Sequence, residues 1–174
     1  MISDFFFQIA SLKKLPRSGW KIKLGLKDSE SVAEHSYLMS VMSMVLADTK
    51  SLDSEKVIKM SILHDWAESK IGDFMPDEIG YDKKSELENY AMIEILESLP
   101  QILQENYQNI WNEFLIQETS EAKLVHQLDK LEMALQAKIY EEETDSDSVK
   151  PFIISAVEQI IDPDVKKILV EIIK

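Results

Sequence analysis

The chain has 174 residues, of which 45% are hydrophobic and 29% are charged, and its formal net charge is −13. This composition excludes a disordered or fibrous protein, and the acidic charge argues against a nucleic-acid polymer as partner, because contact with a phosphate backbone needs clustered lysine and arginine. The sequence contains no cysteine, which excludes disulfide bonds and thiolate metal sites.

The length fits one domain with a single core, so residues 1–174 are expected to fold as one unit. With 4 glycines and 5 prolines, the chain favours helices over a fold with many turns. The apolar spacing predicts a first helix from Ser3 to about Leu15, which ends before Pro16. Residues 17–30 are predicted to form a polar loop, in which a short extended piece is suggested by the alternation of lysines with Trp20, Ile22 and Leu24.

The next two helices carry histidines. The segment Ser31-Val-Ala-Glu34 is a capping box, in which each of the two end side chains satisfies an exposed backbone donor. The helix that it opens places on one face Val32, His35, Met39, Met42 and Leu46. A second helix is predicted from Asp53 or Ser54 to Gly72, and on one of its faces lie Val57, Ser61, His64 and Glu68.

The rest of the chain also follows the helical period. Helices are predicted near residues 84–98, 103–114 and 120–142. The acidic stretch 141–148 is predicted as a turn, and two short helices flank Asp162-Pro163 in the C-terminal part, residues 150–174. The sequence therefore predicts an all-α fold.

The N-terminus lacks the basic start of a signal peptide, and no apolar run approaches the length needed to span a bilayer. The expected location is cytoplasmic, and no membrane partner is expected.

Four residues on three predicted helices could carry chemistry: His35, His64, Asp65 and Asp129. Both histidines lie on apolar faces, and Asp129 lies close to the buried side of its helix. Burying these groups is costly unless they are paired or bound to a metal. From spacing alone, two interpretations stay open: hydrogen-bonded core residues, or ligands of one cation such as Mn, Fe, Co, Ni or Zn.

The order His35 … His64-Asp65 … Asp129 resembles the H…HD…D signature of the HD-domain metal-dependent phosphohydrolases. The surrounding motifs resemble those of the HD-domain 5′-deoxynucleotidases, and they read Arg17-Ser-Gly-Trp20, Glu30-Ser-Val-Ala-Glu-His35-Ser, His64-Asp-x-x-Glu68-x-x-x-Gly72-Asp73 and Gln127-Leu-Asp129-Lys-Leu-Glu132-Met. Together these motifs cover roughly residues 15–140.

The resemblance implies an HD-domain helical bundle with one divalent metal between its helices, held by His35, His64, Asp65 and Asp129. These ligands accept Mn, Co, Fe, Ni, Zn or Mg, so they do not identify the metal. Four protein ligands on an ion that accepts six leave two positions, for water and a phosphate oxygen. Attack on the phosphoryl group would release a nucleoside and phosphate.

The resemblance also implies roles for residues around the metal. Glu68 lies one turn beyond His64, where it would act on the attacking water as base or orienter, or support a ligand. Asp73 would take part in proton transfer, including transfer to the leaving ribose oxygen. Arg17 would contact the phosphate or sugar, and Trp20 would pack against the sugar and exclude a 2′-hydroxyl.

The expected function is hydrolysis of deoxyribonucleoside 5′-monophosphates by a homodimer. The alternatives are another HD-type reaction, on a phosphodiester, a nucleoside triphosphate or a different small metabolite, or a non-catalytic metal-stabilised nucleotide-binding module. Few cationic residues surround the motifs, which favours a monophosphate, and a structural site would need neither Glu68 nor Asp73. His126, Lys84 and Lys130 are given no role. The C-terminal helix carries apolar residues that a contact between subunits and a place in the core explain equally well: Val165, Ile168, Leu169 and Ile172.

Overall fold

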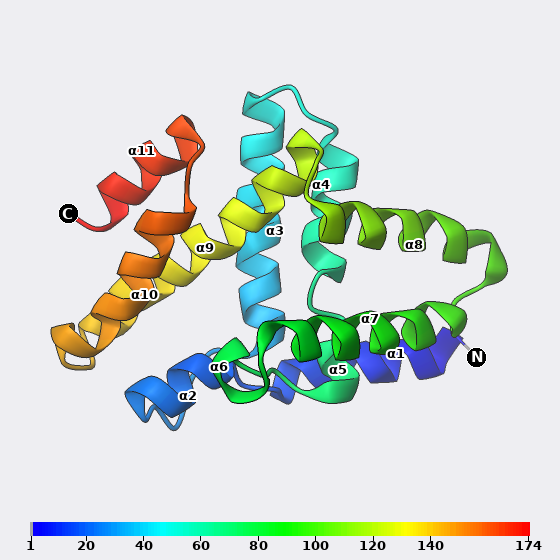
Figure 1. The fold of residues 1–174 in the computed structure, drawn as a ribbon, viewed down its shortest axis with the longest axis horizontal. Coiled ribbons are helices and arrows are strands. Elements are labelled where there is room, and N and C mark those ends of the chain that lie inside the picture. Colours follow the sequence, from blue (N-terminus) through cyan, green and yellow to red (C-terminus); the bar gives the residue numbers. More distant parts are fainter. Residues whose placement is uncertain (1) are drawn as a thin grey trace.

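The computed structural model describes residues 2–174, apart from the side chains of residues 76 and 77. Helices make up the regular structure of these residues (Figure 1), which contain no strand and a single isolated bridge between Pro16 and Ser31. In chain order the elements are α1 (Ile2–Ala10), the 3₁₀ helix η1 (Ser11–Lys14), α2 (Ser18–Leu24), α3 (Val32–Thr49), α4 (Ser54–Leu63), α5 (Glu68–Ile71), α6 (Pro76–Ile79), α7 (Tyr81–Glu97), α8 (Gln101–Ile116), α9 (Ser120–Glu141), α10 (Ser146–Gln159) and α11 (Pro163–Ile172). The predicted all-α fold is confirmed.

Helix α9 is the element around which the others pack. It contacts α3, α4, α8, α10 and α11, and Figure 1 shows it crossing beside α3 with the C-terminal helices along its other side. Its buried residues include Leu128, Leu131 and Ala134, which join the main apolar core. A long helix that is enclosed in this way can place a polar residue among several other elements, and Asp129 lies in this central stretch.

The predicted capping box at the start of α3 is present. The Glu34 backbone N–H donates to Ser31 Oγ (3.2 Å), and the Ser31 N–H donates to Glu34 Oε2 (2.7 Å). Because the helix begins at Val32, His35 lies in its first turn, where its side chain is fully buried. The cap therefore fixes the part of α3 that carries the first histidine.

The predicted continuous helix from Asp53 to Gly72 is wrong in its middle. Asp53 does cap α4, but the helix ends at Leu63, and α5 begins at Glu68. Between them the backbone turns tightly, with bonds from Trp66 N–H to Leu63 O (3.0 Å) and from Glu68 N–H to Asp65 O (3.1 Å). The tighter turn aims His64 and Asp65 into the interior while the chain changes direction.

The predicted loop at residues 17–30 is also wrong, because residues 18–24 form α2. Trp20 and Leu24, four residues apart, pack in a second apolar cluster with Phe152, whereas Ile22 is exposed. The spacing of four residues is helical and overrides the alternation with lysines. Gly25 ends the helix with φ +67°, a left-handed conformation that suits glycine.

The predicted C-terminal pair of helices, α10 and α11, is present, but α10 begins at Ser146, inside the stretch 141–148 predicted as a turn, because Asp145 caps it there. Val165 and Leu169 on α11 are buried in the main core, so these two residues belong to the core and offer no exposed contact. Within the described residues, no helix has both the length and the apolar character required to cross a membrane.

Candidate metal centre

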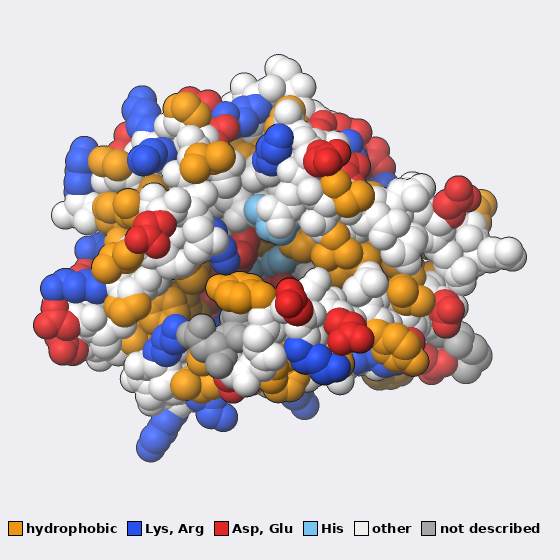
Figure 2. Space-filling model, viewed as in Figure 1, with side chains coloured by type: hydrophobic (Ala, Val, Ile, Leu, Met, Phe, Trp, Pro, Cys, Tyr) orange, Lys and Arg blue, Asp and Glu red, His pale blue; other side chains and the backbone are white. Residues whose placement is uncertain are grey.

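The four predicted metal ligands come together in space, although they are far apart in sequence. His35 comes from α3, His64 and Asp65 from the turn after α4, and Asp129 from α9. Asp65 Oδ2 lies 3.1 Å from His64 Nε2 and 3.7 Å from His35 Nε2, and Asp129 Oδ1 lies 3.4 Å from His35 Nε2. Figure 2 shows histidine side chains at the bottom of a hollow on this face of the molecule.

The ring nitrogens of the two histidines are arranged for a shared ligand. His64 Nδ1 lies 2.7 Å from Ser61 O, and His35 Nδ1 lies 2.5 Å from Glu132 Oε2. Since these oxygens accept hydrogen bonds, each Nδ1 carries a hydrogen. Both Nε2 atoms are buried without a hydrogen-bond partner. Donor atoms of His35, His64 and Asp129 lie within 4.8 Å of one another, and two imidazoles with carboxylates are a donor set that fits a divalent cation.

The electrostatics of the cluster also suit positive charge at its centre. Burial and the nearby Arg17 oppose protonation of His35, but the adjacent carboxylates of Asp129 and Glu132 outweigh them and raise its pKa to about 9. Burial opposes ionisation of Asp129, yet Lys130 and His35 hold its pKa well below the usual value. The metal-free protein therefore keeps a proton on His35 Nε2, at the position where a cation would bind.

Arg17 lies against the two carboxylates of the site. Its Nη1 is 3.4 Å from Asp65 Oδ2, and its Nη2 is 3.8 Å from Asp129 Oδ1. Burial lowers the pKa of Arg17, but Asp65 and Asp129 outweigh this effect and raise it. The guanidinium is therefore a fixed positive group at the edge of the cluster.

Glu68 and Asp73 flank the cluster and differ in their surroundings. Glu68 is 3% exposed, and its Oε2 is buried without a hydrogen-bond partner. Burial, followed by the charges of Asp65 and Asp73, raises the pKa of Glu68 well above its usual value. Asp73 is tied to the start of α2, where Ser18 N–H donates to its Oδ2 (2.7 Å) and Ser18 Oγ donates to its backbone oxygen (2.5 Å).

A cavity of about 340 Å³ opens above these residues. The sequence-predicted residues in its lining are Arg17, Trp20, Asp65, Glu68, Asp73 and Asp129. Trp20 forms part of the wall but is only 2% exposed, because its ring packs on Phe152 with centroids 4.3 Å apart. The ring therefore meets the cavity through a small part of its surface.

Several lining residues were not predicted as part of the site. Lys84 and Lys130 both line the cavity. Lys84 Nζ donates to Phe74 O (2.7 Å) and Lys130 Nζ to Asp129 Oδ2 (2.8 Å). Lys130 follows a predicted ligand directly, which is a usable signal in the sequence. Lys84 has no such signal, since it approaches the cavity from α7.

His126, which was given no role, is held elsewhere. Its Nε2 lies 2.8 Å from Phe114 O, and its ring stacks on Phe114 with centroids 4.1 Å apart.

Comparison with known proteins gives consistent matches. A sequence model of the family described as HD domain matches residues 9–169. The human protein named 5′-deoxynucleotidase HDDC2 is 38% identical over 140 residues, covering 80% of this chain and 68% of its own length. The protein of the same name from Dictyostelium discoideum is 40% identical over 148 residues, covering 80% of this chain and 77% of its own length.

Solved structures also match over nearly the whole chain. The PH0347 protein from Pyrococcus horikoshii OT3 superposes with a TM-score of 0.76 at 31% identity, covering 99% of this chain and 98% of its own. A protein from Magnetospirillum magnetotacticum MS-1, titled a predicted metal-dependent phosphohydrolase, superposes with a TM-score of 0.74 at 22% identity, covering 98% and 88%. The second match shows the fold alone.

Proposed function

The chain belongs to the HD-domain family, and on that basis we propose that it hydrolyses deoxyribonucleoside 5′-monophosphates to a deoxynucleoside and phosphate in a metal-dependent reaction. The resemblance predicted from the histidine and aspartate motifs is confirmed by this membership. The observation that carries the proposal is the convergence of two unpartnered imidazole nitrogens and two carboxylates at a cavity that also contains Arg17. The names of the human and Dictyostelium relatives support the choice of substrate.

In this proposal His35, His64, Asp65 and Asp129 hold one divalent cation. When bound, the cation supplies a Lewis acid for a phosphoryl oxygen and makes a coordinated water more acidic. Its identity stays open among Mn, Co, Fe, Ni, Zn and Mg, because histidine and carboxylate ligands accept all of them.

The protein's own residues bind the phosphate and move protons. Arg17 presents a fixed cation to the phosphate oxygens, and Lys84 and Lys130 add positive charge at the cavity wall. Glu68, which has a raised pKa and an unpartnered oxygen, accepts the proton of the attacking water. As the new P–O bond forms, the bond from phosphorus to the ribose 5′ oxygen breaks, and Asp73 directs a proton to that leaving oxygen.

Selection of deoxyribose is assigned to Trp20. Its ring is held between Phe152 and Tyr140, and its Nε1 donates to Glu30 Oε1 (2.7 Å). A ring fixed by these contacts cannot move away to admit an extra hydroxyl, so a 2′-OH placed against it would clash.

We also keep three expectations from the sequence as proposals: that residues 1–174 form one domain, that the protein acts in the cytoplasm, and that it is a homodimer. Since Val165 and Leu169 are buried in the core, the dimer contact must lie elsewhere than at these residues. The outer face of α3 is a candidate, because it exposes the apolar residues Tyr37, Val41, Met44 and Val45. Sedimentation of the wild type and of a Val41→Glu variant tests this contact.

The experiment that tests the function is phosphate release from dAMP and AMP in parallel. Metal-stripped protein is reloaded with Mn²⁺, Co²⁺, Mg²⁺ or Zn²⁺, and His64→Ala serves as the variant without a complete site. We expect turnover of dAMP well above that of AMP, and loss of both in the variant. Equal rates would remove the role given to Trp20. Release of pyrophosphate or tripolyphosphate from triphosphates, with no release from dAMP, would replace the proposed substrate, and binding without turnover of any nucleotide would indicate a binding module.

A further inference from the structure

A buried carboxylate lies behind the metal cluster. Glu132 is one turn after Asp129 on α9, its side chain is fully buried, and its Oε2 is 2.5 Å from His35 Nδ1. No lysine or arginine of the described residues lies within 4 Å of it, and its Oε1 has no hydrogen-bond partner. Burying a carboxylate costs free energy, and the partner that offsets this cost is the His35 ring.

The two metal-facing histidines are supported by different acceptors. His64 Nδ1 meets the neutral backbone carbonyl of Ser61, whereas His35 Nδ1 meets the carboxylate of Glu132. In both cases the bond at Nδ1 turns Nε2 toward the cluster. A carboxylate does more than a carbonyl, because its charge increases the electron-donating power of the opposite ring nitrogen.

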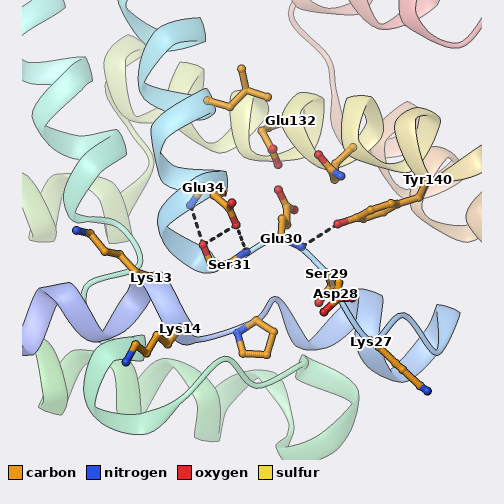
Figure 3. Close-up of a pocket in the computed structure, with 13 residues that line it drawn as sticks. Lys13, Lys14, Lys27, Asp28, Ser29, Glu30, Ser31, Glu34, Glu132 and Tyr140 are labelled. Carbon is orange, nitrogen blue, oxygen red and sulfur yellow. Dashed lines mark hydrogen bonds between the residues drawn. The ribbon is translucent and has the colours of Figure 1, made fainter. Parts of the chain in front are cut away.

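A second acid, Glu30, faces Glu132 from the side away from the substrate cavity. Figure 3 shows Glu30 and Glu132 pointing toward one another at a second cavity, of about 700 Å³. Donor atoms of Glu30, His35 and Glu132 lie within 4.8 Å of one another. Glu30 is fixed in turn, since its Oε1 accepts the Trp20 Nε1–H (2.7 Å) and its N–H donates to Tyr140 Oη (2.8 Å). The carboxylate that binds the Trp20 indole thus lies beside the acid behind His35.

We propose that Glu132 is a positioning residue, which fixes the His35 ring with Nε2 toward the cation and strengthens this nitrogen as a ligand. The role rests on the proposed metal site. In this role Glu132 increases the affinity of the site for its metal. Glu68 and Asp73 carry the chemistry, which is separate.

The test compares Glu132→Gln and Glu132→Met with a matched control, Glu34→Gln. Glu34 lines the same second cavity, and a glutamine can keep its capping box with Ser31. Binding of Mn²⁺ to metal-free protein is measured by calorimetry at fixed pH. We expect roughly 10–100-fold weaker binding for the methionine variant, because supporting partners of metal ligands have effects of this size. The Mn²⁺ affinity of the glutamine variant should lie between those of the wild type and the methionine variant, since its amide oxygen accepts the hydrogen bond without the charge. The affinity of the control should match that of the wild type.

Two further readouts separate positioning from a structural role. The methionine variant leaves the buried His35 Nδ1–H without its acceptor, so its metal-free melting temperature should fall, whereas the glutamine variant keeps an acceptor and should melt close to the wild type while still binding Mn²⁺ more weakly. The proton NMR spectrum should lose the hydrogen-bonded ring resonance of His35 in the methionine variant, which three histidines make simple to assign.

The outcomes are distinguishable. A wild type that binds no metal would overturn the proposed metal site and this role with it. Equal Mn²⁺ affinity in wild type and methionine variant, with metal bound by both, would overturn the role alone. Two cations per wild-type chain, with one lost in the methionine variant, would make Glu132 a ligand of a second cation and also overturn it. If the methionine variant does not fold, the glutamine variant decides.

Discussion

At the scale of single residues, Glu68 offers the sharpest division between chemistry and stability. Its buried carboxylate has a raised pKa and no partner for Oε2. We predict that Glu68→Gln lowers kcat by roughly 10²–10⁴-fold, the range for loss of a general base, with Mn²⁺ affinity unchanged. Parallel kinetics and calorimetry check this, with exposed Glu86→Gln as the matched control. Activity within a few-fold of the wild type would remove Glu68 from the reaction.

The same substitution has a predictable effect on the metal-free fold. Because the pKa of Glu68 is raised in the folded state, ionisation favours the unfolded chain, and wild-type stability falls as pH rises above the ordinary pKa of a glutamate. We predict that Glu68→Gln is more stable than the wild type at pH 7 and that the difference shrinks on acidification. Urea unfolding with a chelator present, at pH 7 and pH 5, measures it. A difference in the free energy of unfolding that grows on acidification would contradict the prediction.

The sequence predicted single residues of the site with unequal success, for physical reasons. His35, His64, Asp65 and Asp129 were named because their order forms a family motif, and the structure does bring them within reach of one another. Glu132 was part of a quoted motif but was given no role, because a sequence does not show that an acid is buried. Lys84 was passed over, because most lysines are solvated and only the packing of α7 brings this one to the cavity.

At the scale of elements, long helices with caps were predictable and short ones were not. α3 and α9 have many turns of periodic apolar residues, so their position followed from the pattern. α2 spans only residues 18–24, and two apolar residues four apart compete there with an alternation that looks extended. The break after Leu63 was missed for another reason: the helical face continues through His64 to Glu68, although the backbone has turned more tightly.

The capping box of α3 leads to a prediction at this scale. Ser31→Ala removes the hydroxyl that accepts the Glu34 N–H, and we expect a loss of about 1 kcal/mol in the free energy of unfolding. The matched control is Ser40→Ala on the same helix, where the hydroxyl donates to Ser36 O within the helix and its loss should be nearly neutral. Urea unfolding of both variants with a chelator present measures the difference. Equal stability of the two variants would show that the Ser31 cap does not stabilise the protein.

At the scale of the whole molecule, the site joins elements that the chain keeps apart. The donors come from α3, the end of α4 and α9, so a cation that binds them holds the centre of the bundle together. A cation that binds the folded state alone, at about 100 times its Kd, should raise the free energy of unfolding by about 2.7 kcal/mol. Thermal melting with and without Mn²⁺ checks this value. His126→Ala should keep the increment and His64→Ala should lose it; an increment of the same size in both would place the metal elsewhere.

The distance along the chain between His35 and Glu132 has a consequence for biosynthesis. The two side chains that meet behind the cluster are 97 residues apart, and α9 is the last of the donor-bearing helices to leave the ribosome. A nascent chain that has reached only α8 holds His35, His64 and Asp65 but lacks both Asp129 and Glu132. Long-range contacts of this kind form slowly and late. A cation that needs all four groups can therefore be held only after α9 has been synthesised and has packed against α3.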